Sequence, residues 1–361
     1  MPPGYNAKVG NLQTFTLPAD VTDTPGHRAM GRAMIQTWRQ EGILQISTDS
    51  EGQQLQQQAM EASRRFFRRP SHEKAACVDS QSYAGYIASG EEITDGIADY
   101  SEIFTVLKDL PPSDPRVQAQ WPCHGPCPWP PPFPDRETTT TMKAPIEAYM
   151  TWLGRQGERL LRLIEYGLGV SEGSLTRYTR DGWHHQRVLR FPARNATNGR
   201  GKTGRGIGSH TDYGLLVIAS QDDVGGLFIR PPRQDEEFAN WEKSAAGLRE
   251  EDDGWVYVPP VPDVHTVFLG DMMQYLTKNH LTATPHKVGL NTRERFVFAY
   301  FHEPNFAAVL KPLDGSEGAL HYGTHFTNMF MRNYPDRITT QRLVRENRYD
   351  KLAERELRCY S

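Results

Sequence analysis

Two histidines and one aspartate in this chain have the types and spacing of metal ligands. His210 and Asp212 are separated by one residue, and His286 lies far along the chain in a Thr-Pro-His-Lys-Val segment. In a β-strand, residues two positions apart point to the same side, so His210 and Asp212 can face one ion while His286 arrives from a distant strand. Two imidazoles and one carboxylate hold non-haem Fe(II) on one face and leave the opposite face open. The pattern therefore predicts an Fe(II) site that a substrate and dioxygen can reach.

An arginine nine residues after His286 has the chemistry to bind an acidic co-substrate. The guanidinium of Arg295 presents a planar fork of donors, which suits a carboxylate deeper in the same pocket. Arg293 shares the strand parity of Arg295 and is the alternative anchor. We favour Arg295 because Arg293 follows an Asn-Thr pair typical of a turn, where a solvated arginine is the usual case.

Four other histidines compete with His286 for the place of the third ligand. They are His280, His302 and the adjacent pair His184 and His185. His286 is favoured because it stands between a turn-forming proline and the strand that leads to the arginine anchor. A His-x-Asp pair is common by chance. The metal assignment therefore depends on this pair together with the later His286 and Arg295.

Composition excludes several classes of protein. The 361 residues include 41 basic and 44 acidic side chains, and the net charge of -3 provides no field that favours nucleic acid or an anionic membrane. No segment approaches the roughly 20 apolar residues of a membrane span, and we expect no signal peptide because the first residues lack a charged start and an apolar stretch. The four cysteines are too scattered for a secreted disulfide framework. We expect a soluble, intracellular protein located in the cytoplasm.

Hydrophobic spacing predicts helices and short strands in the first half of the chain. Apolar residues recur with helical spacing over 28–40, and Ser50 can cap a helix that runs from 53 to 69. The stretch 111–134 is crowded with proline and cannot form a regular element. The longest predicted helix covers 146–168 and would pack on the sheet as a scaffold. Strands are expected at 43–46, 83–88 and 102–106.

The second half of the chain is rich in predicted strands. Gly225-Gly226 and Gly270-Asp271 have the composition of hairpin turns, and 204–208 is expected to be a flexible lead into the metal strand. About eight short strands suggest a double-sheet jelly roll. The strands are predicted at 187–191, 215–219, 226–229, 255–258, 266–269, 272–276, 286–288 and 296–301.

These elements predict an α+β fold, a double-stranded β-helix (jelly roll) core with flanking helices. Residues 1–135 are expected to form a mixed N-terminal region, and 136–180 the scaffold helix. The catalytic core is expected at 181–310. Residues 311–361 are expected to return over the barrel as helices at 326–334 and 341–358.

Four blocks of sequence resemble one enzyme family. They are 86–92 (Tyr-Ile-Ala-Ser-Gly-Glu-Glu), 181–185 (Asp-Gly-Trp-His-His), 208–216 (Gly-Ser-His-Thr-Asp-Tyr-Gly-Leu-Leu) and 329–337 (Met-Phe-Met-Arg-Asn-Tyr-Pro-Asp-Arg). With them, nearly the whole chain resembles the Fe(II)/2-oxoglutarate-dependent oxygenases of the isopenicillin-N-synthase-like group. More narrowly, it is similar to the branch of that family that forms ethylene and succinate. The last two blocks together are far more specific than the three metal ligands alone.

The resemblance implies a role for each residue that matches a family motif. A carboxylate suits a guanidinium, and an arginine suits an α-carboxylate, so the implied L-arginine site is also chemically sensible. By resemblance, His210, Asp212 and His286 bind Fe(II), Arg295 and Arg187 contact 2-oxoglutarate beside Phe301, and Glu92, Thr94, Tyr213, Arg332 and Tyr334 hold L-arginine.

The implied reaction uses Fe(II), 2-oxoglutarate and O2 in a monomeric enzyme. One branch fragments 2-oxoglutarate to ethylene and CO2, and the other gives succinate and hydroxylates L-arginine. A related 2-oxoglutarate-dependent hydroxylase or oxidase of another small molecule is the alternative. A binding module without activity and a zinc hydrolase are also open, although a hydrolase gains nothing from Arg295 beside an open coordination position.

Two positions depart from the family pattern. The broad family has Ser or Thr two positions after the anchoring arginine, whereas this chain has Val297, which predicts a more apolar pocket. Asn333 stands where bacterial members of the ethylene-forming branch have a cysteine. Without the resemblance, Arg187 would be interpreted as a salt-bridge residue on a strand face, and Glu92 as part of a solvated acidic pair.

Overall fold

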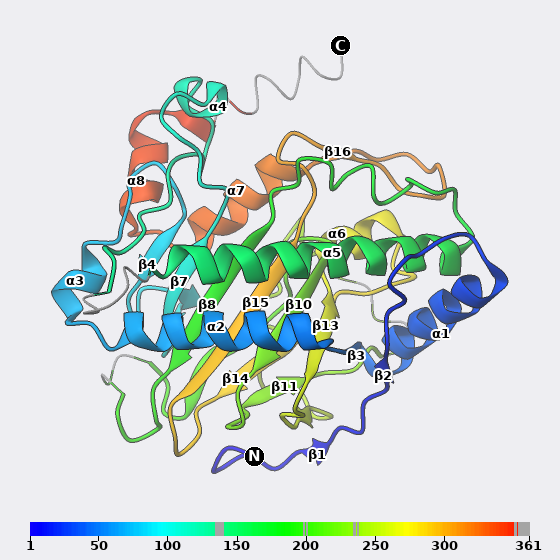
Figure 1. The fold of residues 1–361 in the computed structure, drawn as a ribbon, viewed down its shortest axis with the longest axis horizontal. Helices are drawn as coiled ribbons and strands as arrows, with labels where there is room; N and C mark the ends of the chain where they lie inside the picture. The colour runs from blue at the N-terminus through cyan, green and yellow to red at the C-terminus, as the bar shows by residue number, and fades with distance from the viewer. Residues whose placement is uncertain are drawn as a thin grey trace.

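The computed structural model describes the chain except residues 134–140, 198, 200, 234–235, 237, 350–351 and 353–361. Two β-sheets form its centre (Figure 1). The smaller sheet has the order β1 (Lys8–Val9), β12 (Val256–Val258), β11 (Leu227–Ile229), β14 (His286–Gly289), β9 (Arg205–His210). The larger has the order β2 (Thr14–Phe15), β3 (Ile43–Ser47), β13 (Val264–Leu269), β10 (Leu216–Gln221), β15 (Arg295–His302), β8 (His185–Phe191), β7 (Glu102–Val106), β4 (Gly85–Ile87).

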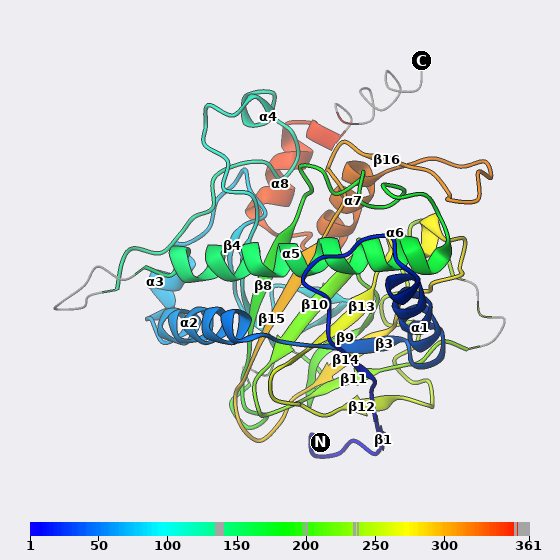
Figure 2. The same cartoon turned by 45° about the vertical axis from the view of Figure 1, so that its right-hand side comes forward.

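Helices cover the outer face of the larger sheet. Helix α5 (Lys143–Leu168) runs across β15 and β10, with α1 (Pro25–Glu41) and α2 (Ser50–Phe67) packed beside it (Figures 1 and 2). Its buried face includes Tyr149, Leu153 and Leu160 at helical spacing. The predicted scaffold helix and the α+β jelly-roll class are confirmed. The remaining elements are α3 (Ser71–Ala75), α4 (Pro115–Gln118), α6 (Asp271–Leu276), α7 (Tyr322–Asn333), α8 (Ile338–Arg345) and the strand pairs β5 (Ile93–Thr94) with β6 (Ile97–Ala98) and β16 (Val309–Leu310) with β17 (Leu320–His321).

Strands from the N-terminal part of the chain extend the larger sheet of the core. Strand β3 pairs antiparallel with β13, and β7 pairs antiparallel with β8. Residues 1–135 and 181–310 therefore share one sheet. The division of the chain at 135, 180 and 310 stays a prediction, and its first boundary lies outside the described residues.

The predicted strand at 272–276 is wrong, because these residues form helix α6. Gly270 is the N-cap of this helix and Asp271 begins it, so the predicted hairpin turn at these two residues is also wrong. Met272, Met273 and Leu276 are buried at helical spacing. The turn at 225–226 likewise joins β10 of one sheet to β11 of the other instead of closing a hairpin.

Several boundaries differ from the predicted ones for local reasons. Asp49, and not Ser50, caps α2, since its carboxylate accepts the backbone N–H of Gly52 at 2.8 Å. The proline-rich stretch contains the short helix α4, which begins with Pro115 at a position that needs no N–H donor. The expected flexible lead at 204–208 forms most of β9. Helix α8 ends at Arg345, and part of the predicted 341–358 helix lies outside the described residues.

The contact between α1 and α5 depends on Gly31. A Cβ at this position would lie 2.1 Å from the carbonyl oxygen of Leu163 and 2.8 Å from the backbone nitrogen of Gly167. We expect Gly31→Ala to lower the free energy of unfolding by about 3 kcal/mol, because neither backbone can retreat without moving a helix. Urea denaturation measures the change.

Gly26 of the same helix provides the matched control, since a Cβ there would meet nothing closer than 3.9 Å. Gly26→Ala is expected to leave the unfolding free energy within about 1 kcal/mol of the parent value. Equal denaturation midpoints for the two variants would contradict the close helix packing.

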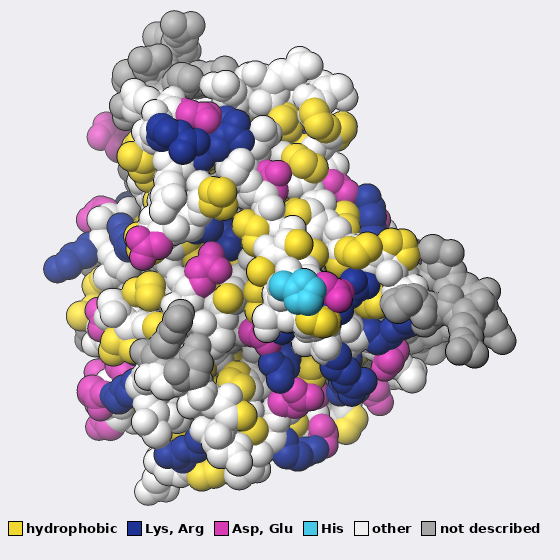
Figure 3. All heavy atoms as spheres, turned by 90° about the vertical axis from the view of Figure 1, so that its left-hand side faces the viewer, with side chains coloured by type: hydrophobic (Ala, Val, Ile, Leu, Met, Phe, Trp, Pro, Cys, Tyr) yellow, Lys and Arg dark blue, Asp and Glu magenta, His cyan; other side chains and the backbone are white. Residues whose placement is uncertain are grey.

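Basic, acidic and apolar side chains are interspersed on the face shown in Figure 3, in agreement with the nearly balanced charge of the sequence. Among the described residues, no helix combines the length and apolar character of a membrane span.

Candidate active site

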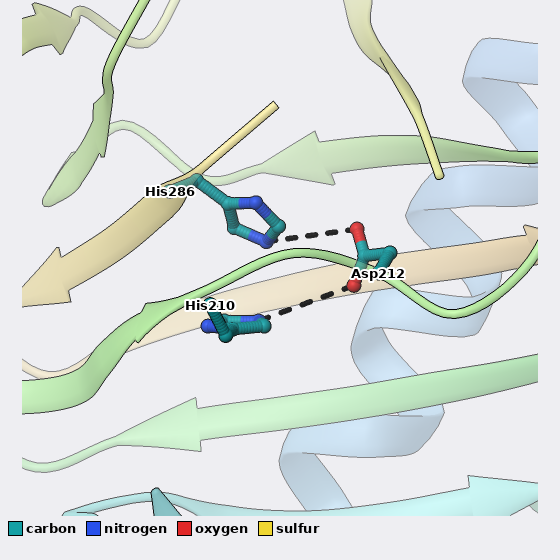
Figure 4. Close-up of side chains that lie close together, drawn as sticks. All are labelled: His210, Asp212 and His286. Atoms are coloured by element: carbon teal, nitrogen blue, oxygen red, sulfur yellow. Dashed lines mark ion pairs between the residues drawn. The ribbon is translucent and has the colours of Figure 1, made fainter. Parts of the chain in front are cut away.

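The two histidines and the aspartate meet between neighbouring strands of the smaller sheet. Strands β9 and β14 are antiparallel, and their register places His286 opposite His210. Asp212 Oδ1 lies 3.9 Å from His210 Nε2, and Asp212 Oδ2 lies 3.6 Å from His286 Nε2 (Figure 4). Asp212 follows the end of β9 instead of lying within the strand as predicted, so the chain bend after His210 brings its carboxylate to the imidazoles.

Both imidazoles are oriented to offer Nε2 to a metal. His210 Nδ1 lies 2.8 Å from the carbonyl oxygen of Gly208, and His286 Nδ1 lies 3.0 Å from that of Thr284. An N–H at Nδ1 donating to a carbonyl leaves the lone pair on Nε2. Burial, followed by the neighbouring His286, lowers the pKa of His210 to about 3, which keeps this ring neutral. One ligand atom from each of the three residues lies within 4.8 Å of the others, so the donor set fits Fe(II).

The competing histidines lie outside the cluster of His210, Asp212 and His286, although His185 lines a cavity that His210 and Asp212 also line. His302 Nε2 is 3.0 Å from a carboxylate oxygen of Glu158, and the His184 ring stacks on the His302 ring at 4.2 Å. His185 stacks on Phe301 at 4.3 Å. His280 is exposed and lines an outer cleft beside α1. None of the four joins the cluster of His210, Asp212 and His286.

A cavity between the two sheets runs from the cluster of His210, Asp212 and His286 to Arg295. We call it the inner cavity. It is lined by the inward-facing residues of β8, β9, β10, β11, β13, β14 and β15. These are Arg187, Leu189, Phe191, Ile207, His210, Val217, Ala219, Gln221, Leu227, Thr266, Phe268, His286, Val288, Arg295, Val297, Ala299 and Phe301, together with Asp212.

Arg295 is a buried cation in this cavity, with 3% of its surface exposed. Its Nη2 donates to Gln221 Oε1 at 3.0 Å, while Nε and Nη1 have no hydrogen-bond partner among the described residues. Burial lowers the pKa of Arg295 to about 10, so the guanidinium remains charged at neutral pH. A buried guanidinium with unused donors fits the carboxylate of a ligand. Arg293 instead pairs with Asp223 at 2.9 Å, with 62% of its side chain exposed.

Val297 lines the inner cavity on the same side of β15 as Arg295, with Ala299 and Phe301 beyond it. Gln221 supplies the polar contact that sequence reasoning missed. Strand β10 turns Val217, Ala219 and Gln221 toward the cavity, in register with Phe301, Ala299 and Val297 of β15. A polar residue on an otherwise apolar strand face was the available signal.

A second cavity opens on the other side of the metal cluster, and we call it the outer cavity. Of the five residues expected to hold L-arginine, Glu92, Thr94, Tyr213 and Tyr334 line it. Arg332 does not line it. This residue is exposed on α7, and its Nη1 lies 3.7 Å from the sulfur of Met329. Asn333 lines the cavity and donates to the hydroxyl of Tyr213.

Asp99 connects the strand pair β5 and β6 to β9, the strand that ends at His210. Thr94 Oγ1 donates to Asp99 Oδ2 at 2.5 Å, and Arg205 Nε of β9 donates to Asp99 Oδ1 at 3.1 Å. The backbone N–H of Gly208 donates to the same oxygen at 3.1 Å. Burial, followed by the charge of Glu92, raises the pKa of Asp99 to about 7. These contacts fix Glu92 and Thr94 relative to His210.

Glu92 and Arg187 form an ion pair between the two cavities. Arg187 Nη2 lies 2.7 Å from each carboxylate oxygen of Glu92, and the Tyr334 hydroxyl donates to Glu92 Oε1 at 2.5 Å. Although burial opposes its charge, Glu92 raises the pKa of Arg187 well above the usual range. Arg187 is thus paired on the strand face as the salt-bridge interpretation expected, and Glu92 is buried and not solvated.

The segment between β11 and β12 contributes residues that the sequence did not indicate. Asn240 is buried, and its Nδ2 donates to Asp271 Oδ1 at 2.6 Å and to the hydroxyl of Thr211. Gly247 N donates to the carbonyl oxygen of Ser209 at 2.7 Å, which holds residues 244–246 against the outer cavity. No periodic pattern marks this irregular segment, so only the fold reveals its position.

This fold and this site define a class of enzyme. Two histidines and one aspartate converge at one end of a jelly-roll cavity that contains a buried arginine, which is the arrangement suited to a non-haem Fe(II) oxygenase. Residues 183–304 match the 2OG-Fe(II) oxygenase superfamily, and residues 12–132 match the N-terminal region described as non-haem dioxygenase in morphine synthesis. The chain belongs to the 2OG-Fe(II) oxygenase superfamily and is a 2-oxoglutarate-dependent dioxygenase that uses Fe(II).

Among known proteins, the chain is 51% identical over 348 residues to the 2-oxoglutarate-dependent ethylene/succinate-forming enzyme of Ralstonia nicotianae, covering 95% of this chain and 97% of that protein. It is 28% identical over 294 residues to homoarginine-6-hydroxylase of Arabidopsis thaliana, covering 76% and 80% of the two chains. A full-length protein of Neurospora crassa, solved in complex with alpha-KG and thymine, has a TM-score of 0.70 at 16% identity, covering 90% of this chain and 97% of that one. This last similarity shows the fold alone.

Proposed function

We propose that this oxygenase converts 2-oxoglutarate and O2 to ethylene and CO2, and that a second branch at the same site forms succinate and hydroxylates L-arginine. The observation that carries the substrate assignment is a buried carboxylate, Glu92, in the wall of a cavity that also reaches His210 and Asp212. The extensive similarity to an ethylene/succinate-forming enzyme supports the choice of products.

His210, Asp212 and His286 are proposed to hold Fe(II), and Arg295 to bind the distal carboxylate of 2-oxoglutarate in the inner cavity. Arg187 would face the carboxylate nearer the metal, and Phe301 would form part of the apolar wall. Fe(II) held there would supply the redox chemistry of dioxygen, with 2-oxoglutarate as the co-substrate that is oxidised. The chain's own contribution is to orient the co-substrate along the cavity and to exclude water with the apolar residues of β10 and β15.

Glu92 is proposed to accept the guanidinium of L-arginine, with Thr94, Tyr213 and Tyr334 completing the outer cavity. The Thr94 hydroxyl donates to Asp99, so its oxygen retains acceptor capacity for a substrate N–H. Arg332 stays a proposed partner of the α-carboxylate from its exposed position on α7, beside Met329 in the cavity wall.

L-arginine is expected to bind the anaerobic protein loaded with Fe(II) and 2-oxoglutarate, and calorimetric titration measures this. Glu92→Gln keeps the side-chain shape but removes its charge, so we expect arginine affinity to fall roughly 30-fold or more. Glu91→Gln is the matched control, because the Glu91 carboxylate pairs with Arg337 and does not line the cavity. L-citrulline, which lacks the charge, and L-lysine, which lacks the planar fork, should compete poorly.

A specific observation favours one alternative substrate. Three homoarginine-6-hydroxylases from plants are 25–28% identical to this chain, and L-homoarginine carries the same guanidinium on a longer stem. Titration with L-homoarginine, followed by gas chromatography for ethylene and mass spectrometry of the amino acid, separates the two proposals. Tighter binding of L-homoarginine without ethylene would replace the ethylene-forming proposal with a hydroxylase.

A further inference from the structure

A third cavity lies beside Thr211 and Pro285, and we call it the rear cavity. Thr211 stands between the first two proposed metal ligands, and Pro285 directly precedes the third. The rear cavity is also lined by three arginines, and none of these lines the inner or the outer cavity. They are Arg230, Arg233 and Arg249. The proposed reaction therefore makes no use of this cluster of positive charge.

Two of the three guanidiniums are buried, and the third stands where the rear cavity meets the solvent. The side chain of Arg230 is 2% exposed and that of Arg249 is also buried, whereas Arg233 is 45% exposed. Among the described residues that line the cavity, Glu236 is the only acidic one. Asp252 contacts Arg230 from outside this lining. The described lining thus carries three positive charges and one negative charge.

The donors of the two buried arginines are only partly used. Arg230 Nη2 lies 2.6 Å from both carboxylate oxygens of Glu236, and Arg249 Nε donates to Glu236 Oε1 at 2.7 Å. Arg230 Nε has only an ion-pair contact, at 3.4 Å, with Asp252 Oδ2. Arg230 Nη1 is buried and has no hydrogen-bond partner among the described residues. An unpaired buried donor is unfavourable, so this nitrogen favours an anion in the cavity.

The size of the rear cavity limits the ligand that it can take. Its empty volume is about 370 Å³, compared with about 640 Å³ for the inner cavity, which is proposed to hold 2-oxoglutarate. A ligand with roughly half as many heavy atoms as 2-oxoglutarate therefore fits. Guanidinium groups match the oxygens of phosphate and of carboxylates with paired donors. Size and charge together indicate a small oxyanion.

We propose that the rear cavity binds a small oxyanion, inorganic phosphate or bicarbonate, between Arg230 and Arg249. The Glu236 carboxylate compensates part of their charge and limits the affinity. Bicarbonate forms from CO2, which the proposed reaction releases, whereas phosphate comes from the surrounding solution. The site needs neither L-arginine nor ethylene formation, so the proposed function and this inference can fail separately.

The rear cavity is connected to both strands that carry the proposed metal ligands. The backbone N–H of Arg230, directly after β11, donates to the carbonyl oxygen of Pro285 at 2.9 Å. Asn240 Nδ2 donates to the hydroxyl of Thr211. An anion shared by Arg230 and Arg249 would join β11 to the segment between β11 and β12. Because a ligand stabilises the folded state that binds it, we expect phosphate to raise the urea midpoint at constant ionic strength.

The test is calorimetric titration of phosphate into the anaerobic protein with stoichiometric Fe(II) and saturating 2-oxoglutarate, at constant ionic strength. The co-substrate occupies Arg295, so phosphate is excluded from that guanidinium. Glu236→Gln keeps the side-chain shape and removes the competing charge, and it is expected to raise phosphate affinity roughly tenfold. Arg230→Gln and Arg249→Gln are each expected to lower it roughly tenfold or more. Parallel titrations with bicarbonate establish which oxyanion binds more tightly.

Two exposed ion pairs provide the matched controls. Glu51→Gln removes one carboxylate, and Arg293→Gln removes one guanidinium, from pairs that do not line the rear cavity. Both variants should bind phosphate within about twofold of the parent affinity, because exposed charges contribute little. Urea midpoints establish that each variant is folded. If Arg230→Gln does not fold, Arg249→Gln and Glu236→Gln decide the test.

The absence of saturable binding of both oxyanions to the parent protein would overturn the proposal. Binding to Glu236→Gln alone would show that the Glu236 carboxylate itself fills the site, and would overturn it as well. Unchanged affinity in a folded Arg230→Gln or Arg249→Gln variant would do the same, as would an equal loss in Arg293→Gln. Tighter binding of bicarbonate would support a site for the reaction product, and tighter binding of phosphate a site for the inorganic ion.

Discussion

Replacing His210, Asp212 or His286 with alanine is expected to abolish oxygen consumption, because three protein ligands leave no redundancy at the metal. The three side chains converge from β9, the bend after it and β14 (Figure 4). Loss of a residue that merely orients a ligand weakens metal binding by roughly 10- to 100-fold, and loss of a ligand itself should weaken it further. Calorimetric titration with Fe(II) under anaerobic conditions measures the affinity, and an oxygen electrode measures turnover.

His280→Ala is the control for the ligand variants, since His280 is exposed in an outer cleft. It should bind Fe(II) and consume oxygen like the parent. Near-normal iron affinity in any of the three ligand variants, or loss of iron from His280→Ala, would show that the ligand assignment is wrong.

Arg295→Ala is expected to raise the concentration of 2-oxoglutarate needed for half-maximal activity by roughly 30- to 4000-fold. Removing one partner of a buried charged contact costs about 2–5 kcal/mol, and each 1.4 kcal/mol corresponds to a factor of ten. The guanidinium is buried in the inner cavity, and two of its nitrogens have no hydrogen-bond partner in the part of the chain that the structure describes. Direct binding of 2-oxoglutarate to the anaerobic Fe(II) protein should weaken by a similar factor.

Arg293→Ala separates this effect from a general loss of positive charge. Arg293 is two residues away and pairs with Asp223 at the surface. Exposed pairs contribute little, so we expect less than a threefold change in the 2-oxoglutarate requirement. Similar effects of the two substitutions would mean that Arg295 is not the residue that binds the co-substrate.

Strand parity explains how much of the inner cavity the sequence predicted. Arg295, Val297, Ala299 and Phe301 alternate with residues on the opposite face of β15, and all four line the cavity. Such alternation depends only on the geometry of an extended backbone. Parity assigned Arg295 to the buried face, whereas Arg293 shares that parity and was assigned to the surface because of the turn-like Asn-Thr pair before it. Apolar spacing likewise identified α5, because a helix of this length needs one continuous buried face.

Local sequence patterns predicted the wrong element where the same composition fits both a helix and a strand. The residues after Gly270 are apolar enough for a strand, but the glycine serves as a helix cap and α6 begins at Asp271. The same limit applies to Asp212, which reaches the imidazoles through a bend after β9 and not through strand parity. Short apolar runs fit both a helix and a strand, and contacts made elsewhere in the fold decide between them.

The sequence by itself predicted the three candidate metal ligands, the candidate arginine anchor and the class of fold, because these predictions depend on residue type and on regular spacing. Only the tertiary structure decided which distant side chains meet. Gln221 contacts Arg295, and Asn240 contacts Thr211 between His210 and Asp212. Glu92 pairs with Arg187, which lies 95 positions away in the sequence. These pairings come from strand order and irregular segments, neither of which leaves a periodic trace in the chain. The ion pair of Arg187 with Glu92 is therefore apparent only in the folded structure.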